Sequence, residues 1–160
     1  MEKNLNTIKA EEWLANVKQL DDTEHDPLIT YFFINKSLDM SSGKIAVQSA
    51  RAGQVMLLNE IDKEDTLLLS SLNELFQDEF MHGNKSIALK ANGSQMNRLL
   101  SGDLKDKLDI ISEEANLPIR LYPVYDIGAT EVATNSLTVI AMTPIYKSII
   151  NKFARKFQTY

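Results

Sequence analysis

The chain has 160 residues, 44% of them hydrophobic and 24% charged, which is typical of a single globular domain. Its apolar runs are far shorter than the roughly 20 residues of a membrane-spanning helix, and its polar first residues do not resemble an export signal, so we expect neither insertion nor secretion. The absence of cysteine excludes disulfides, thiolate metal ligands and a cysteine nucleophile, and suits a cytoplasmic protein.

The net charge of -5 is unevenly distributed along the chain. Residues 1–26 and 60–79 are strongly acidic, whereas the remainder carries 13 basic and 8 acidic side chains. A basic surface on that remainder could bind phosphates in spite of the overall charge, if its lysines and arginines cluster in space. The alternative is an ordinary solvated surface of mixed charge.

The first segment is predicted to be an extension of the main domain. Apolar residues between positions 8 and 20 recur at near-helical spacing, which predicts a short amphipathic helix. A charged stretch ending in Pro27 then breaks the pattern. We therefore divide the chain into an acidic helix and linker at residues 1–26 and a domain at residues 27–160.

The domain is predicted to open with a strand and a long helix. Residues 28–34 form an almost unbroken run of aromatic and β-branched side chains, typical of a buried strand. Ser41 and Ser42 are suitable caps for a helix reaching about Glu60. Its predicted core face is a stripe of small and apolar residues, namely Ala46, Ala50, Gly53 and Leu57. A second helix is expected from Thr66 to His82, ending at Gly83.

The remaining elements complete an α/β fold. We expect a strand at residues 86–90, a helix at 95–115, and strands at 120–125 and 136–142. Pro123 predicts an edge position for the third strand, and Pro144 can begin a terminal helix. Long crossovers imply parallel first strands, and the short last connection implies an antiparallel pair. The expected architecture is one domain with a mixed four-stranded sheet packed by helices on both faces.

The start of the long helix carries the first candidate chemistry. Gly43 and Lys44 lie where free backbone amides and the positive helix end favour an anion. Lys44, Gln48 and Arg51 are spaced to project from one face and form a polar wall, roughly opposite the predicted core stripe. A phosphate-binding P-loop is excluded, because it needs glycine at position 38 and a hydroxyl residue at position 45. The alternative is that the Lys44 side chain is solvated and has no functional role.

A second candidate is the segment Asp126-Ile127-Gly128-Ala129-Thr130. It places a carboxylate at the end of a strand, followed by a glycine that can adopt a turn closed to other residues. Strand ends in α/β sheets commonly hold active-site groups, although an Asp–Gly pair there can also form only a turn. His25 and His82 are isolated and have no metal-ligand spacing, so we expect no metal site.

These two segments together resemble the type 2 peptidyl-tRNA hydrolases. Residues 31–52 are similar to that family's first strand and its Met-x-x-Gly-Lys-x-Ala-x-Gln helix, and residues 126–144 to its Asp-Ala-Gly-x-Thr turn and following strand. The resemblance covers all but the N-terminal extension and weakens across residues 62–83. It assigns an active site to five residues, namely Lys44, Gln48, Asp126, Thr130 and Thr138. Arg51 replaces a usual histidine, and Ala129 replaces a frequent arginine.

The resemblance implies hydrolysis of the ester that joins a peptidyl group to tRNA. No cluster of metal ligands is visible in the sequence, so we expect no cofactor. Asp126 would orient or deprotonate water, Lys44 would stabilise the oxyanion or a tRNA phosphate, and the other site residues would donate or accept hydrogen bonds. Substrate binding is expected from Gly43, Arg51 and Gly128. The expected partner is tRNA, not DNA or a membrane, and a homodimer is left open. The alternatives are a noncatalytic interaction protein on the same fold and a hydrolase of another ester or amide. Basic residues expected to face tRNA are Lys44, Arg51 and some of Lys85, Lys90, Lys147, Lys152 and Arg155.

Overall fold

The computed structural model describes residues 26–61, 85–129 and 131–160. The predicted helices at residues 8–20 and 66–82 and the candidate residue Thr130 lie outside these ranges. Along the chain, the described elements are β1 (Leu28–Asn35), the short 3-10 helix η2 (Lys36–Leu38), α2 (Ser42–Ile61), β2 (Ser86–Ala91), α5 (Gly93–Ser101), α6 (Asp103–Ala115), β3 (Leu121–Tyr125), β4 (Leu137–Tyr146), α7 (Lys147–Ala154) and β5 (Gln158–Thr159).

The strands form one mixed sheet in the order β3-β4-β1-β2-β5. β1 and β2 are parallel and β3 and β4 are antiparallel, as the connection lengths predict. β4 is also antiparallel to β1. β3 lies at an edge, which confirms the position inferred from Pro123. The expected number of four strands is wrong, because Gln158 and Thr159 pair with β2 and add a fifth.

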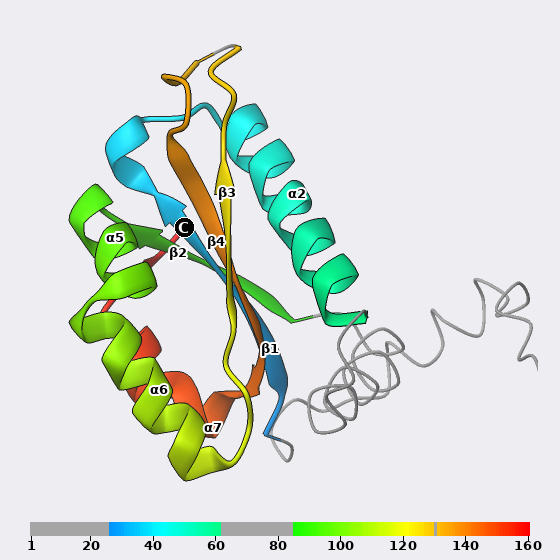
Figure 1. Ribbon diagram of the computed structural model, residues 1–160, viewed down its shortest axis with the longest axis vertical. Coiled ribbons are helices and arrows are strands. Elements are labelled where there is room, and N and C mark those ends of the chain that lie inside the picture. The colour runs from blue at the N-terminus through cyan, green and yellow to red at the C-terminus, as the bar shows by residue number, and fades with distance from the viewer. Residues whose placement is uncertain (1–25, 62–84, 130) are drawn as a thin grey trace, which may run out of the picture.

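Helices cover both faces of this sheet, as expected. α2 packs on one face, and α5, α6 and α7 pack on the other (Figure 1). β1 supplies both cores because its side chains alternate: Tyr31 and Phe33 face α5 to α7, whereas Ile34 faces α2. No helix within the described ranges has the length and hydropathy to cross a membrane.

Two predicted boundaries are wrong. The helix expected at residues 95–115 is interrupted at Gly102, whose backbone is extended and not helical (φ -169°, ψ -163°). Pro144 does not begin a helix but lies inside β4, which continues to Tyr146. The register between β4 and β1 shifts at this point, and such an irregularity tolerates a residue without a backbone donor.

The buried face of α2 also differs from the predicted stripe. Ala46 and Ala50 are exposed, and the helix instead buries residues spaced four apart, namely Gln48, Ala52, Met56 and Glu60. Two of these four side chains are polar, so a pattern based on apolar residues misplaces the face. Their burial is possible because Arg120 and Tyr122, at the start of β3, hydrogen-bond to Glu60, and Thr138 of β4 hydrogen-bonds to Gln48.

Candidate active site

The site forms where the first turn of α2 meets the end of β3. Since α2 packs across β3 and β4, Lys44 in its first turn approaches Asp126, the residue that follows β3. Lys44 Nζ forms an ion pair with Asp126 Oδ2. The two side chains are only 12% and 4% exposed, so the pair is largely withdrawn from solvent. The structure thus brings together two candidates that are distant in sequence.

The turn after β3 fixes the Asp126 carboxylate. The Asp126 amide donates to the Ser136 carbonyl at 2.9 Å, and the Asp126 carbonyl accepts from the Asn135 amide at 2.7 Å. The Gly128 amide lies 3.3 Å from Asp126 Oδ1 and donates to it. Gly128 has φ +76°, and an added Cβ would lie 2.4 Å from the Thr134 nitrogen. Glycine is therefore required at this position.

The surroundings of Asp126 favour its charged form. The Lys44 ammonium is the largest influence and holds the Asp126 pKa below its ordinary value of 3.8, against the opposing effect of burial. The Gly128 amide acts in the same direction as Lys44. Asp126 is therefore an ionised carboxylate at neutral pH, held against a cation in a nearly closed site.

A second polar pair continues the site along the same helix face. Gln48 lies one turn beyond Lys44, and its Oε1 accepts a hydrogen bond from the Thr138 hydroxyl at 2.8 Å. The same hydroxyl lies 3.1 Å from the Val124 carbonyl oxygen. Both Gln48 and Thr138 are buried. Lys44 and Gln48 therefore face the sheet side by side, and Arg51 does not complete the predicted wall because it is exposed.

A further residue, Glu131, joins the two halves of the site and was not predicted. Ser41 caps α2, its hydroxyl oxygen accepting from the Lys44 amide at 3.2 Å. Glu131 accepts from the Ser41 amide at 2.9 Å and from the Ser41 hydroxyl at 2.6 Å. These hydrogen bonds lower the Glu131 pKa, and the Lys44 charge adds to the effect. Only its position directly after the Asp126–Thr130 segment could have indicated Glu131 from the sequence.

The anion expected at the start of α2 is thus a carboxylate of the chain itself. Gly43 lies exposed in the first turn of α2. Among the basic residues considered for a tRNA-facing surface, Lys44 and Arg51 are on α2. Three others, Lys147, Lys152 and Arg155, lie in or directly after α7 on the opposite face of the sheet (Figure 1).

The assembled geometry provides a buried ammonium–carboxylate pair next to an amide anchored by a hydroxyl. Such a group can orient a water molecule and stabilise negative charge that develops on a carbonyl oxygen. Comparison with protein families finds a match over residues 28–160 to the family described as Peptidyl-tRNA hydrolase PTH2. The matched region begins with β1 and includes every described residue of the site.

Proposed function

The chain belongs to the peptidyl-tRNA hydrolase PTH2 family, and we propose that it hydrolyses the ester bond of peptidyl-tRNA and releases free tRNA. The observation that carries this proposal is the buried ion pair between Lys44 and Asp126, adjoining Gln48 and Thr138. We place the catalytic domain at residues 27–160, treat residues 1–26 as an extension, and expect the protein to act in the cytoplasm, where translation supplies its substrate.

The proposed reaction begins with a water molecule positioned by Asp126. Water attacks the ester carbonyl carbon, the bond to the ribose oxygen breaks, and the proton lost by the water ends on that oxygen. Because its pKa is lowered, the Asp126 carboxylate is a weak base, which favours orienting the water over removing its proton in a separate step. Lys44 is the charge that stabilises the developing oxyanion.

Gln48 and Thr138 are proposed to support the same transition state. Because the Thr138 hydroxyl engages the Gln48 amide oxygen, the donors that Gln48 can offer to a substrate are those of its amide nitrogen. Thr138 then acts by holding this amide in place. Thr130, which lies outside the described residues, keeps its proposed role as a hydrogen-bonding residue of the site on the family resemblance alone.

The tRNA is proposed to approach the N-terminal half of α2. Arg51 is exposed there and can contact a phosphate, and Gly43 and Gly128 allow a close approach of the substrate to the backbone. Glu131 sets a limit on this binding, because its negative charge lies at the helix end that would otherwise attract a phosphate. Phosphate contacts therefore fall mainly to lysine and arginine side chains.

The test is the release of tRNA from a purified N-blocked aminoacyl-tRNA, with the unblocked aminoacyl-tRNA as the matched control. We expect turnover of the blocked substrate and binding of tRNA that weakens steeply with salt, since neutralised phosphates release counterions. Binding without hydrolysis would favour the noncatalytic alternative. Hydrolysis of simple esters or amides, with no action on the tRNA ester, would favour the alternative substrate.

A further inference from the structure

β3 leaves one edge of the sheet open within the described residues. β5 pairs with β2 at the opposite edge, but the described ranges provide no strand beyond β3. The Arg120 carbonyl accepts from the Thr143 amide, and the Asp126 amide donates to the Ser136 carbonyl, so backbone groups at even positions bond toward β4. The backbone groups of Leu121, Pro123 and Tyr125 consequently point away from the sheet. Pro123 has no amide hydrogen to donate, but its carbonyl oxygen can still accept a hydrogen bond.

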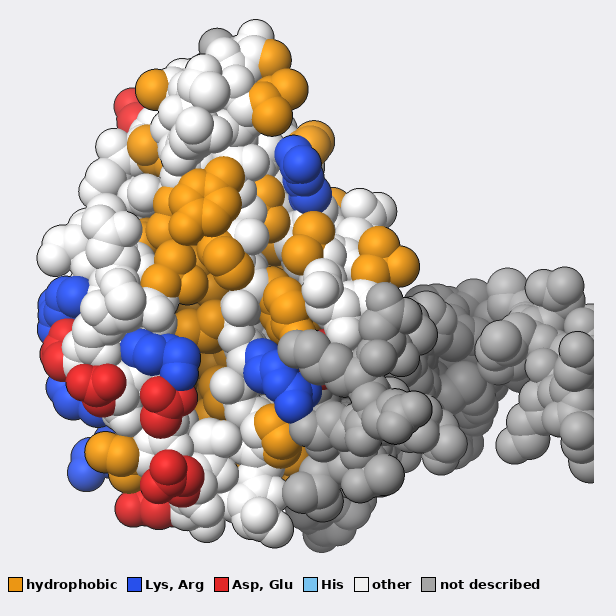
Figure 2. Space-filling model, viewed as in Figure 1, with side chains coloured by type: hydrophobic (Ala, Val, Ile, Leu, Met, Phe, Trp, Pro, Cys, Tyr) orange, Lys and Arg blue, Asp and Glu red, His pale blue; other side chains and the backbone are white. Residues whose placement is uncertain are grey.

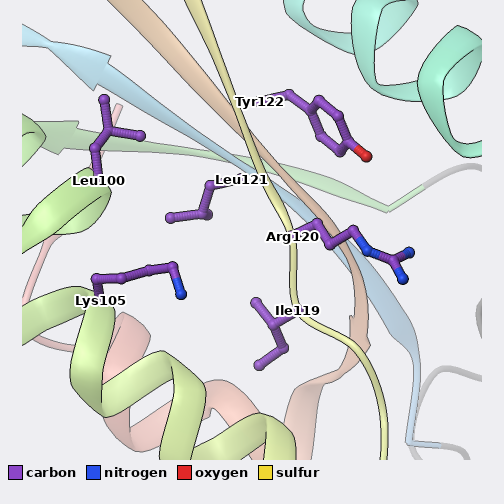
Figure 3. Close-up of a pocket in the computed structure, with 6 residues that line it drawn as sticks. All are labelled: Leu100, Lys105, Ile119, Arg120, Leu121 and Tyr122. Atoms are coloured by element: carbon purple, nitrogen blue, oxygen red, sulfur yellow. The ribbon is translucent and has the colours of Figure 1, made fainter.

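This edge is also apolar. Figure 2 shows hydrophobic side chains gathered along the front of the molecule, where β3 runs in Figure 1. At its lower part is an open groove of about 350 Å³, and Figure 3 shows Leu121 and Ile119 pointing to one side of the strand and Tyr122 to the other. The groove is lined by Leu100, Lys105, Ile119, Arg120, Leu121 and Tyr122.

The apolar edge is continuous with the candidate active site. Tyr125 and Ile127, which flank Asp126, are 48% and 70% exposed. β3 therefore both lines the groove and leads directly to the Asp126 carboxylate. At roughly 3.4 Å per residue, the path from Leu121 to Asp126 is about 17 Å long, the span of four or five residues of extended peptide.

The charges in the groove argue against a nucleic acid as its occupant. Lys105 forms an ion pair with Asp109, and Arg120 forms one with the buried Glu60. Both cations of the groove lining therefore have carboxylate partners within the chain. A groove with neutralised cations and apolar walls suits a largely uncharged chain better than a phosphate backbone.

We infer that the β3 edge binds the peptide part of peptidyl-tRNA as an added, extended strand. This inference rests on the proposed function. The peptide is esterified through its C-terminal carboxyl, so with the ester at Asp126 and Lys44 it must run back toward Leu121 and lie parallel to β3. Main-chain hydrogen bonds to a strand edge do not depend on side chains, which allows peptides of many sequences to bind.

The test is a series of N-acetyl peptidyl-tRNAs with one to five residues in the peptide, assayed by kcat/KM. Burying roughly 60 Å² of apolar surface in the groove corresponds to about a tenfold gain, so we expect kcat/KM to rise about tenfold by the fifth residue. Leu121→Gln, which replaces apolar groove surface by a polar amide, should reduce this gain. The matched control Ile110→Gln, at a 54% exposed position on α6, should retain it.

The outcomes separate the inference from the proposed function. Hydrolysis at equal rates for all peptide lengths overturns the inference and leaves the proposed function intact, whereas no hydrolysis at any length overturns both. Tyr125→Ser, at an exposed position, provides the same test if Leu121→Gln does not fold. If Leu121→Gln instead retains the length dependence and converts a dimer to a monomer in sedimentation, the edge binds a second copy of the chain and the inference is wrong.

Discussion

The hydrogen bonds of Thr138 allow a sharp test, because valine can replace threonine with almost no change in shape. Thr138→Val removes the only donor that the structure places against the Gln48 oxygen within the described residues, and also removes the contact to the Val124 carbonyl. Leaving a buried acceptor unpaired costs about 1–3 kcal/mol. We therefore expect a loss of stability of about 1–2 kcal/mol.

The effect on catalysis should exceed the effect on folding. Gln48 would lose the contact that orients its amide, and removing a donor to an oxyanion typically lowers kcat by about 10²- to 10³-fold. Because Thr138→Val leaves the Gln48 donor in place but no longer oriented, its contribution is only partly lost. We therefore expect kcat for an N-blocked aminoacyl-tRNA to fall at least about tenfold. Thr138→Ser is the matched control, because it keeps the hydroxyl and removes a buried methyl group.

Two measurements decide the outcome: urea denaturation gives the free energy of unfolding, and single-turnover hydrolysis gives the chemical step. The expected pattern is that Thr138→Ser loses stability but keeps the rate per folded molecule, whereas Thr138→Val loses both. A folded Thr138→Val protein that hydrolyses at the wild-type rate would refute the role assigned to the Gln48–Thr138 pair.

Three further predictions follow from the remaining contacts. Lys44→Ala removes the main cause of the low Asp126 pKa and leaves burial, which raises that pKa. Because the ionised carboxylate is the active form, the acid limb of the residual kcat/KM profile should move to higher pH. An acid limb at the wild-type pH would contradict this prediction. Glu60→Gln weakens a buried ion pair to Arg120 and should lower the free energy of unfolding, measured by urea denaturation, by about 2 kcal/mol. A decrease of less than about 0.5 kcal/mol would contradict this prediction. Glu131→Gln removes the negative charge at the start of α2, so tRNA affinity at low salt should rise about two- to fivefold, and equal or weaker binding would count against it.

Local sequence patterns correctly predicted the first strand and the start of the long helix. The apolar run at residues 28–34 predicted β1, and Ser41 does cap α2. Pro123 predicted an edge strand because a missing donor is tolerated only where no neighbour requires it. The same logic failed for Pro144, since the irregular register between β4 and β1 that accommodates it depends on a distant strand.

The buried face of α2 could not be predicted from the helix alone. Gln48 and Glu60 resemble surface residues, and each is buried because a partner on another element satisfies it, Thr138 for Gln48 and both Arg120 and Tyr122 for Glu60. Such partners are set by tertiary contacts that hydrophobic periodicity does not encode. Helical spacing therefore groups Arg51 with Gln48, although the two side chains differ in exposure.

The candidate site was predicted as a set of residues and not as a geometry. The family resemblance assigned Lys44 and Asp126 to one active site, and their ion pair shows that the two residues lie together. The link through Glu131 had no sequence signal, because an exposed glutamate in a loop is ordinary and its partner Ser41 is distant along the chain.

The central claim is that Asp126 serves the hydrolytic step, and Asp126→Asn tests it most directly. The substitution keeps the size of the side chain and removes the charge, while Asp109→Asn provides the same change at a surface ion pair on α6. In single-turnover hydrolysis of an N-blocked aminoacyl-tRNA, we expect folded Asp126→Asn to be about 10²- to 10⁴-fold slower, with tRNA binding retained and the Asp109→Asn control at the wild-type rate. A folded Asp126→Asn protein that hydrolyses this substrate as fast as the wild type would contradict the account.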